Sequence, residues 1–458
     1  MFQFVTLPLF LLICVAALAS AEWALVLVTL MFGVEQSLQT SSPTFLERSW
    51  LANVIVALVC GLTALRKVVS YPGTMQGYFT PVWMGILGLY AWSAISLVWT
   101  PSFASASEII TSNFPYFLLF ILVAPCLLDN MTSVGRFARG VLYSGIFVVL
   151  TLVANPEFGT WSGRMGLVVG GKLITNPLAI GELGGTLLIL AALLRTGPAP
   201  ALLATARIAA FIMGAVLAIQ SGSRGQLVFA VLVAIAFYPV SKRLKSVFAF
   251  MGTAVGVAVI AAGVLLLAQN LLVGFAAQRW EAGALEGGFQ QRMANAGELL
   301  AEFVRSPMAW FLGLGANAFS SLNAVAAKDV YVHNMPTEIL AELGIPMLVL
   351  FVALVVTTAR AGYRLFQRYA EHPVERASLS VLLALGAYQF CLINKQGNLW
   401  ANGMLFLYML LITRIEIRTR DEYGGPELDE LADHSAEDED GQPLSAEEEP
   451  VAAGADQR

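Results

Sequence analysis

Charged residues are scarce in this chain of 458 residues. Only 12% of the side chains are Asp, Glu, Lys or Arg, whereas 57% are hydrophobic, and the mean hydropathy is +0.72. A water-soluble protein cannot cover its exterior with so little polar surface, so a bilayer is the expected solvent. Apolar runs of about 17–25 residues, each long enough to cross a hydrocarbon core, recur along the sequence. The composition predicts an all-α, polytopic helical membrane protein.

Histidine and cysteine are scarce as well. No Asp-x-Asp motif outside the acidic tail and no cluster of His and Cys with ligand spacing suggests a metal, so we expect no metal and no cofactor. Of the three histidines, we assign no role to His372 or His434, which leaves His333. The cysteines lie in or beside apolar runs, where thiols pack as small apolar side chains; they are Cys14, Cys60, Cys126 and Cys391.

The apolar runs predict about 12 transmembrane helices. The first region, 4–35, is either one overlong helix or two short helices that meet near Ala19–Glu22. It lacks a basic start and another apolar run follows directly, so we interpret it as a retained span rather than a signal peptide. The further spans are expected at about 50–65, 80–98, 112–128, 137–154, 177–194, 203–220, 225–240, 247–268, 336–358, 377–393 and 398–415.

Basic residues orient these spans. Outside the C-terminal tail, 16 of them fall in alternate loops on one face, against nine on the other. The face with more basic residues is expected to be cytoplasmic. From Asp421 onward, 14 acidic residues and a single basic one form a tail that buries little and is expected to be disordered and cytoplasmic. We therefore expect a transmembrane domain over 1–420 and a tail over 421–458.

Three segments are then expected outside, at 155–176, 220–226 and 269–335. The last contains GGFQQRMANAGELLAEFVRSPMAWFLGLG, whose helical spacing predicts an amphipathic helix over 289–304 on the membrane surface. His333 closes this segment, in DVYVHNMPTEILAELGIPM, at the point where polar sequence turns apolar.

Two arginines on the outer face are candidate anion-binding residues. Arg224 follows small residues in AIQSGSRGQLVF, so backbone amides and the guanidinium can share one phosphate. Alternatively, Arg224 caps a helix end and snorkels to water. Arg292 lies near the apolar edge of the amphipathic helix. Arg279 and Arg305, which flank that helix, are interpreted as surface residues that bind lipid headgroups without specificity.

His333 is the candidate catalytic base, because a neutral imidazole accepts protons near pH 7. The alternative is an interfacial histidine at a wet boundary. Asn334 beside it is a supporting candidate that can hold a hydroxyl. Glu182, about one turn inside a span, is a second supporting candidate. Such an intramembrane carboxylate either orients an arginine or a sugar hydroxyl, or pairs structurally with Lys172 or Arg164.

The stretch GLVVGGKL at 166–173 matches the first part of a phosphate-binding loop, G-x-x-x-x-G-K. The next residue is Leu173, where a magnesium-binding Ser or Thr is required. In addition, no strand is expected before the glycines, and the loop is on the face without ATP. We therefore do not expect nucleotide binding.

The outer segments resemble the O-antigen ligase and polymerase superfamily, which contains lipopolysaccharide O-antigen ligases, related polysaccharide polymerases and some protein O-oligosaccharyltransferases. The resemblance rests on SGSRG opening a span, then FQQRMANAGELL, GLGANAF and HNMPTEILAELGIPM in that order, over roughly residues 160–360. The ligase pattern is His, then Asn, Ser or Gln, nine residues, then Gly-x-x and Gly, Thr or Tyr. His333, Asn334 and Gly344 match this pattern, and Met347 departs from it.

The resemblance implies a membrane-embedded glycosyltransferase of the C type, in the bacterial inner membrane with its site facing the periplasm. The donor would be a polysaccharide on undecaprenyl diphosphate, and the acceptor a sugar hydroxyl of lipid A–core. By this resemblance Arg224 and Arg292 bind the diphosphate and His333 is the base, in a metal-independent, inverting transfer. Membrane lipids are the other expected partners, and no nucleic acid is expected.

Two alternatives remain open. A polymerase that joins repeat units on undecaprenyl diphosphate would use the same residues. A secondary transporter or flippase for lipid-linked sugars would explain the many spans and Glu182. Such transporters usually carry inverted repeats with broken helices, however, and no internal similarity of that kind is found. A scaffolding role would leave the outer arginines without an explanation.

Overall fold

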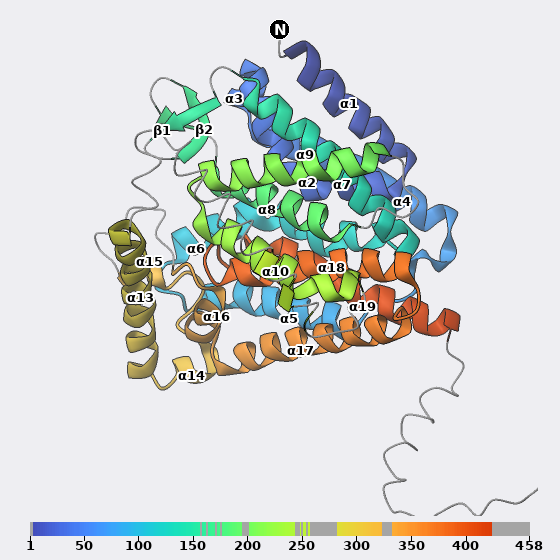
Figure 1. Ribbon diagram of the computed structural model, residues 1–458. Coiled ribbons are helices and arrows are strands. Elements are labelled where there is room, and N and C mark those ends of the chain that lie inside the picture. The colour runs from blue at the N-terminus through green and yellow to red at the C-terminus, as the bar shows by residue number, and fades with distance from the viewer. Residues whose placement is uncertain are drawn as a thin grey trace, which may run out of the picture. The chain divides into compact units, whose positions relative to one another are not determined.

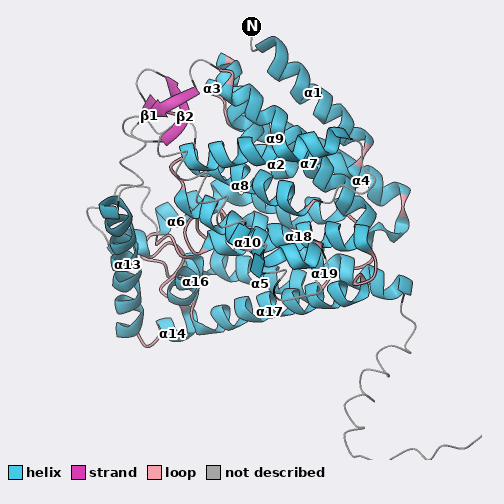
Figure 2. Ribbon diagram, in the orientation of Figure 1, coloured by secondary structure: helices cyan, strands magenta, loops and turns pink. Residues whose placement is uncertain are grey.

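The computed structural model is almost entirely helical (Figure 1) (Figure 2). It describes residues 3–155, 158–161, 164–169, 172–174, 176–194, 201–242, 248, 251–252, 255–256, 282–322 and 332–423. Most of the span expected at 247–268, and nearly all of the expected acidic tail, lie outside the described residues. Contacts divide the chain into Met1–Arg418 and Thr419–Arg458, and the fold below is that of the first unit.

Among the described residues, nine helical runs are long and apolar enough to cross a bilayer, which confirms the all-α, polytopic membrane architecture. These runs comprise α2 (Ala21–Ser41), α4 (Trp50–Ser70), α5 (Pro81–Ile95) with η2 (Ser96–Val98), α6 (Phe103–Phe117) with η3 (Leu118–Val123) and η4 (Ala124–Leu127), α7 (Met131–Val153), α9 (Ala201–Gln220), α10 (Arg224–Ser241), α17 (Ile345–Arg368) and α18 (Pro373–Ile393). Two further apolar helices, α1 (Gln3–Ala19) and α8 (Pro177–Leu193), are shorter, and α19 (Gly403–Tyr423) is the last helix.

The long helix α13 (Ala282–Arg305) and several short elements lie between these helices in the described residues. The short elements are α3 (Pro43–Glu47), η1 (Pro72–Met75), β1 (Phe158–Trp161), β2 (Arg164–Val169), β3 (Lys172–Leu173), α14 (Ala309–Leu312), α15 (Phe319–Leu322), α16 (Met335–Glu338) and the π-helix η5 (Ile339–Leu343).

The first apolar region forms two helices. Ser20 between them has an extended backbone, with φ −138° and ψ 132°, so the helical hydrogen bonds end there. Ser41 near the end of α2 donates to Thr6 Oγ1 near the start of α1 at 2.8 Å, so the two helices run antiparallel. Of the two alternatives, the structure therefore confirms two helices that meet near Ala19–Glu22.

Close glycine contacts set the packing of the helices that carry the site. A Cβ at Gly184 on α8 would lie 2.7 Å from the carbonyl oxygen of Gly214 on α9, and a Cβ at Gly214 would lie 2.7 Å from that of Gly184. The two backbones therefore touch, as small residues permit in membrane helices. This contact holds α8 against α9, so the beginning of α8 lies beside the turn that leads to Arg224.

Basic residues meet Asp129 at one end of the helices. At this end, Arg414 is 1% exposed and donates to Asp129 Oδ1 at 2.8 Å and to the Leu128 carbonyl oxygen at 2.7 Å. Lys67 forms an ion pair with the same Asp129. We call this the Asp129 end. Residues from three of the loops that the basic residues assign to one face thus meet at one end of the helices. That this end faces the cytoplasm stays a prediction.

At the opposite end, which we call the His333 end, residues Ala282–Arg305 of the segment 269–335 form α13. This helix contains the amphipathic helix predicted over 289–304. Leu299 and Phe303 on α13 pack against Phe319 and Val332. One face of α13 is therefore fixed to α15 and to Val332, the residue before His333, and α14 and α15 lie beside it in Figure 1. Its place on the membrane surface stays a prediction.

Two expected spans begin later than predicted. The span expected at 336–358 begins at Ile345, because Gly344 adopts φ 91° and separates it from α16 and η5. Those two short elements contain Glu338 and Glu342, which face protein rather than lipid, and this explains the error. The span expected at 398–415 likewise begins at Gly403.

The segment 155–176, which is expected outside, contains three short antiparallel strands among its described residues. Phe158 on β1 lies opposite Leu167 on β2, and Val168 on β2 lies opposite Leu173 on β3. The expectation that no strand precedes the G-x-x-x-x-G-K sequence was wrong, because β2 begins before it. However, the strand is followed by another antiparallel strand and not by a helix, so it lacks the strand–loop–helix geometry of a phosphate-binding loop.

Candidate active site

The turn before Arg224 is compact because of its small residues. Gly222 in this turn has a positive φ of 67°, a backbone that favours glycine. Ser221 and Ser223 are buried, and a Cβ at Gly181 on α8 would lie 2.7 Å from Ser221 Oγ. Only small side chains fit between α8 and the turn. Arg224 is the first residue of α10 and is partly exposed at the His333 end.

His333 lies directly before α16, with a backbone in the left-handed region (φ 59°) that few residues with a Cβ adopt. Its imidazole is half-buried. Burial, and then the positive charges of Arg292 and Lys395, lower the pKa of His333 to about 4. At pH 7 the imidazole is therefore neutral, and its lowered pKa makes it a weaker base than an ordinary histidine. Because Arg292 acts on His333 from the exposed face of α13, the fold brings two of the predicted site residues together.

Lys395 belongs to the same cluster, although it was not among the predicted site residues. It follows the end of α18, and its ammonium group donates to Gln226 Oε1 on α10. Burial, and then the charges of Arg292 and Arg164, lower the pKa of this ammonium to about 7. The Glu182 carboxylate opposes that shift. The signal in the sequence was weak, because Lys395 was one of nine basic residues assigned to the outer face and lies in a short polar break between two apolar runs.

The side chain of Lys395 crosses Gly225, the neighbour of Arg224. A Cβ at Gly225 would lie 2.8 Å from Lys395 Cε and 3.0 Å from its Nζ, so glycine leaves the room that the lysine occupies. Gln226 donates to Gln396 Oε1 at 2.5 Å, which ties the loop after α18 to the first turn of α10. We call the following residues the cationic cluster: Arg164, Arg224, Arg292, His333 and Lys395.

The two supporting candidates have protein partners. Glu182 accepts a hydrogen bond from Gln389 Nε2 on α18 at 2.5 Å and lies close enough to Lys395 to influence its charge. Asn334 is the N-cap of α16, and its side-chain oxygen accepts from the N–H of Thr337 at 2.9 Å. Asn334 therefore helps to begin the helix after His333, as N-cap residues do, and its amide nitrogen is the group that can still face a substrate.

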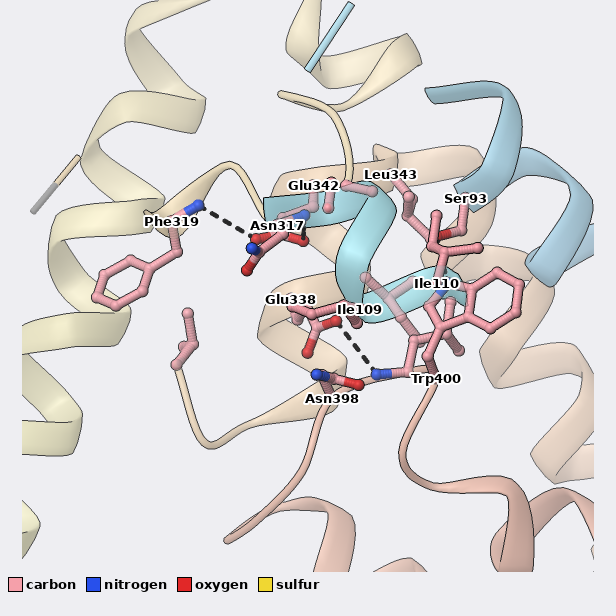
Figure 3. Close-up of a pocket in the computed structure, with 15 residues that line it drawn as sticks. Ser93, Ile109, Ile110, Asn317, Phe319, Glu338, Glu342, Leu343, Asn398 and Trp400 are labelled. Atoms are coloured by element: carbon pink, nitrogen blue, oxygen red, sulfur yellow. Dashed lines mark hydrogen bonds between the residues drawn. The ribbon is translucent and has the colours of Figure 1, made fainter. Parts of the chain in front are cut away.

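Two carboxylates after His333 hold loops of the site in place (Figure 3). Glu342 accepts hydrogen bonds from the backbone N–H groups of Asn317 at 2.6 Å and Phe319 at 3.3 Å. Glu338, one turn earlier, accepts from the N–H of Leu399 at 3.2 Å. Burial raises the pKa of both carboxyls, and the proximity of Glu342 raises that of Glu338 further. The segment directly after the candidate base thus anchors two other loops.

Glu338 and Glu342 belong to the motif TEILAELGIP, but the sequence predicted no role for them. A spacing of four places two side chains on one face of a helix, but it does not say what they face. The role of these carboxylates follows from partners that lie in other loops, at 317–319 and 399. One of these loops also carries Lys395, so Glu338 helps to place an ammonium group beside the imidazole.

Among the residues that the structure describes, no group of three or more His, Cys, Asp or Glu gathers as metal ligands. The fold and the cluster define a polytopic helical membrane protein with guanidinium, ammonium and imidazole groups gathered at one end of its helices. Such a site suits an anionic ligand beside a general base.

Residues 208–352 match a family model described as O-antigen ligase. This match agrees with the resemblance found in the sequence. The matched segment runs from α9 into α17 and includes Arg224, Arg292 and His333. It implies a glycosyltransferase-like enzyme of the ligase or polymerase type. Lys395 and Glu182 lie outside the matched residues. No curated protein matches the chain significantly.

Proposed function

We propose that the protein transfers a glycan from undecaprenyl diphosphate to a sugar hydroxyl of lipid A–core, as an O-antigen ligase of the inner membrane whose site faces the periplasm. The observation that supports this most directly is the gathering of Arg292, Lys395 and a neutral His333 at one end of the helices. A transfer from a lipid diphosphate needs both kinds of group, cations for the leaving group and a base for the acceptor.

The chemistry we propose is a single displacement with inversion. The acceptor hydroxyl oxygen forms a bond to the anomeric carbon while His333 removes its proton, typically a 10²–10⁴-fold contribution to the rate. The bond from that carbon to the diphosphate oxygen breaks, and both of its electrons leave with the diphosphate. Arg224, Arg292 and Lys395 stabilise the charge that develops on this leaving group. Because the donor is already activated, no nucleotide enters the reaction.

A second candidate function is polymerisation of repeat units on undecaprenyl diphosphate, because the family match is compatible with it. The donor and the chemistry are the same, and the acceptor is then another lipid-linked glycan. The family match favours either transferase over the transporter that the number of spans and Glu182 also allowed.

Purified protein in lipid nanodiscs tests the proposal. It is mixed with undecaprenyl-diphosphate glycan and lipid A–core, without added nucleotide or metal, and the products are separated by gel electrophoresis. A joined glycan–lipid A–core product is expected. Longer lipid-linked glycan with no use of lipid A–core would instead establish the polymerase, and no product from either acceptor would contradict both.

Variants assign the roles within that assay. His333→Ala should leave the protein folded and inserted but without product. Arg224→Lys and Arg292→Lys should lose nearly as much activity as the alanine variants, because an ammonium does not replace a guanidinium fork that holds two phosphate oxygens. Full activity of both lysine variants would show that the arginines contribute only their positive charge.

A further inference from the structure

A polar cavity lies beside the cationic cluster, between α2, α6, α8, α18 and the loop before α19. Its volume is about 500 Å³, within the range of about 300–1,000 Å³ typical of small-molecule sites. We call it the amide cavity after the side chains that give it its character: Glu35, Gln36, Asn113, Glu182, Gln389 and Gln396.

The chemistry of this lining points to an uncharged ligand rich in hydroxyl groups. The described residues that line the cavity include amides and two carboxylates, but no Lys, Arg or His. Amides both donate and accept, and carboxylates accept, which matches hydroxyl groups that do both. An anionic ligand, in contrast, would meet two carboxylates with no cation in the wall.

One residue of the cavity wall, Gln36, has a buried acceptor atom without a hydrogen-bond partner. Gln36 is only 4% exposed, and its Nε2 donates to the Asn176 carbonyl oxygen at 3.4 Å. Its Oε1 is buried and has no hydrogen-bond partner. Leaving such an atom unpaired inside a helical membrane protein is unfavourable, and a bound molecule that reaches Gln36 would supply the missing donor.

An aromatic wall completes the cavity. Phe32 and Tyr116 have ring centroids 5.8 Å apart, and Tyr116 is stacked with Phe120 at an interplanar angle of 18°. All three line the cavity. A pyranose ring has hydroxyl groups at its edge and C–H groups on its faces, so a cavity lined by both amides and aromatic rings fits both parts of a sugar.

Two residues that line the amide cavity connect it to Lys395 of the cationic cluster. Glu182 lines the cavity and acts electrostatically on Lys395. Gln396 lines the cavity and accepts from Gln226, which also accepts from Lys395. A ring in the cavity therefore lies next to the groups that we assign to the diphosphate and to the base.

We propose that the amide cavity binds an uncharged sugar ring adjacent to the bond that forms. This inference rests on the proposed function for the identity of the saccharide, which comes either from the donor glycan or from the acceptor core. Both present the same hydroxyl-rich ring, and kinetics with each substrate varied separately distinguishes them.

The test uses Gln36→Met and Asn113→Leu, which keep side-chain bulk but remove the amides. The KM of one substrate, donor or acceptor, should rise about tenfold or more with kcat changed far less, as expected for loss of hydrogen bonds to a ligand. The substrate affected identifies the source of the ring. Ser37→Ala is the matched control: Ser37 neighbours Gln36 on α2 but bonds Thr151 at 2.5 Å, outside the cavity lining, so both KM values should stay unchanged.

A binding measurement separates this inference from the proposed function. Undecaprenyl-diphosphate glycan and core oligosaccharide released from lipid A are each titrated onto the His333→Ala variant, which should bind but not react. Binding of one probe that Gln36→Met weakens about tenfold supports the cavity even if no transfer product is ever found. If transfer occurs but Gln36→Met and Asn113→Leu change neither KM nor the binding of either probe, the cavity proposal is wrong while the transferase stands.

Discussion

Replacing Lys395 by methionine should stabilise the protein while removing most of its activity. Burial and the guanidinium groups of Arg292 and Arg164 lower the pKa of Lys395 from its ordinary value of 10.5 to about 7. At about 1.4 kcal/mol per pKa unit, this corresponds to at most roughly 5 kcal/mol of unfavourable free energy for the charged form. Methionine has a similar length and cannot be protonated, so it avoids this penalty.

The sign of the effect depends on pH. The pKa is lower in the folded state than in the unfolded chain, so the unfolded chain binds more protons between about pH 7 and 10.5. The stability of the wild type therefore rises with pH across this window, and the full penalty is present below pH 7. The advantage of Lys395→Met should be greatest near pH 6 and should shrink as the pH approaches 10.5.

Thermal unfolding in detergent at pH 6 and pH 10, together with the transfer assay at pH 7, measures both effects. We expect a higher unfolding midpoint at pH 6 and a transfer rate lower by about 10²–10³-fold, as for loss of one group that stabilises developing charge. Lys242→Met is the control, because Lys242 is exposed at the end of α10, so its replacement should leave the midpoint nearly unchanged. A lower midpoint for Lys395→Met at both pH values would refute the reasoning and make Lys395 a structural residue.

Three further outcomes are expected. The acid limb of the pH profile of kcat/KM should lie near pH 4, because burial and neighbouring cations lower the pKa of His333, and a limb near 6.5 would contradict this. Gly225→Ala should raise the KM of the donor, since its Cβ would press on the lysine above it; Gly61→Ala, with open space around it, should not. Glu342→Ala should lower the unfolding free energy by about 2–6 kcal/mol by leaving two N–H groups unpaired, whereas Glu302→Ala on the exposed face of α13 should change it by less than about 0.5 kcal/mol.

Local sequence patterns predicted much of the architecture. Apolar runs of spanning length predicted the helices, and the periodicity around Leu299 and Phe303 predicted α13, because both depend only on nearby residues and on the solvent. The small residues before Arg224 predicted a tight turn for the same reason. The breaks at Ser20 and Gly344 were harder to place, since a helix that ends inside apolar sequence leaves little trace in composition.

Short-range motifs also supplied Arg224, Arg292 and His333, but they left out the groups that complete the site. Lys395 occupies an ordinary polar break, and it gains a role only because Gly225 lets it lie across α10. The β-hairpin at 158–173 escaped notice because its strands are too short to show alternation. Asn334 matched the motif, and its side-chain oxygen caps α16.

The sequence alone predicted a helical membrane protein, a face rich in basic residues, and the candidates Arg224, Arg292 and His333. These predictions were possible because hydropathy and charge can be read from neighbouring residues. The amide cavity could not be predicted from the sequence. Gln36 and Gln389 are remote in the sequence, and they line one space because α2, α8 and α18 pack together. Helix packing, set by contacts such as that between Gly184 and Gly214, selects which distant polar groups meet, and no local pattern encodes that choice.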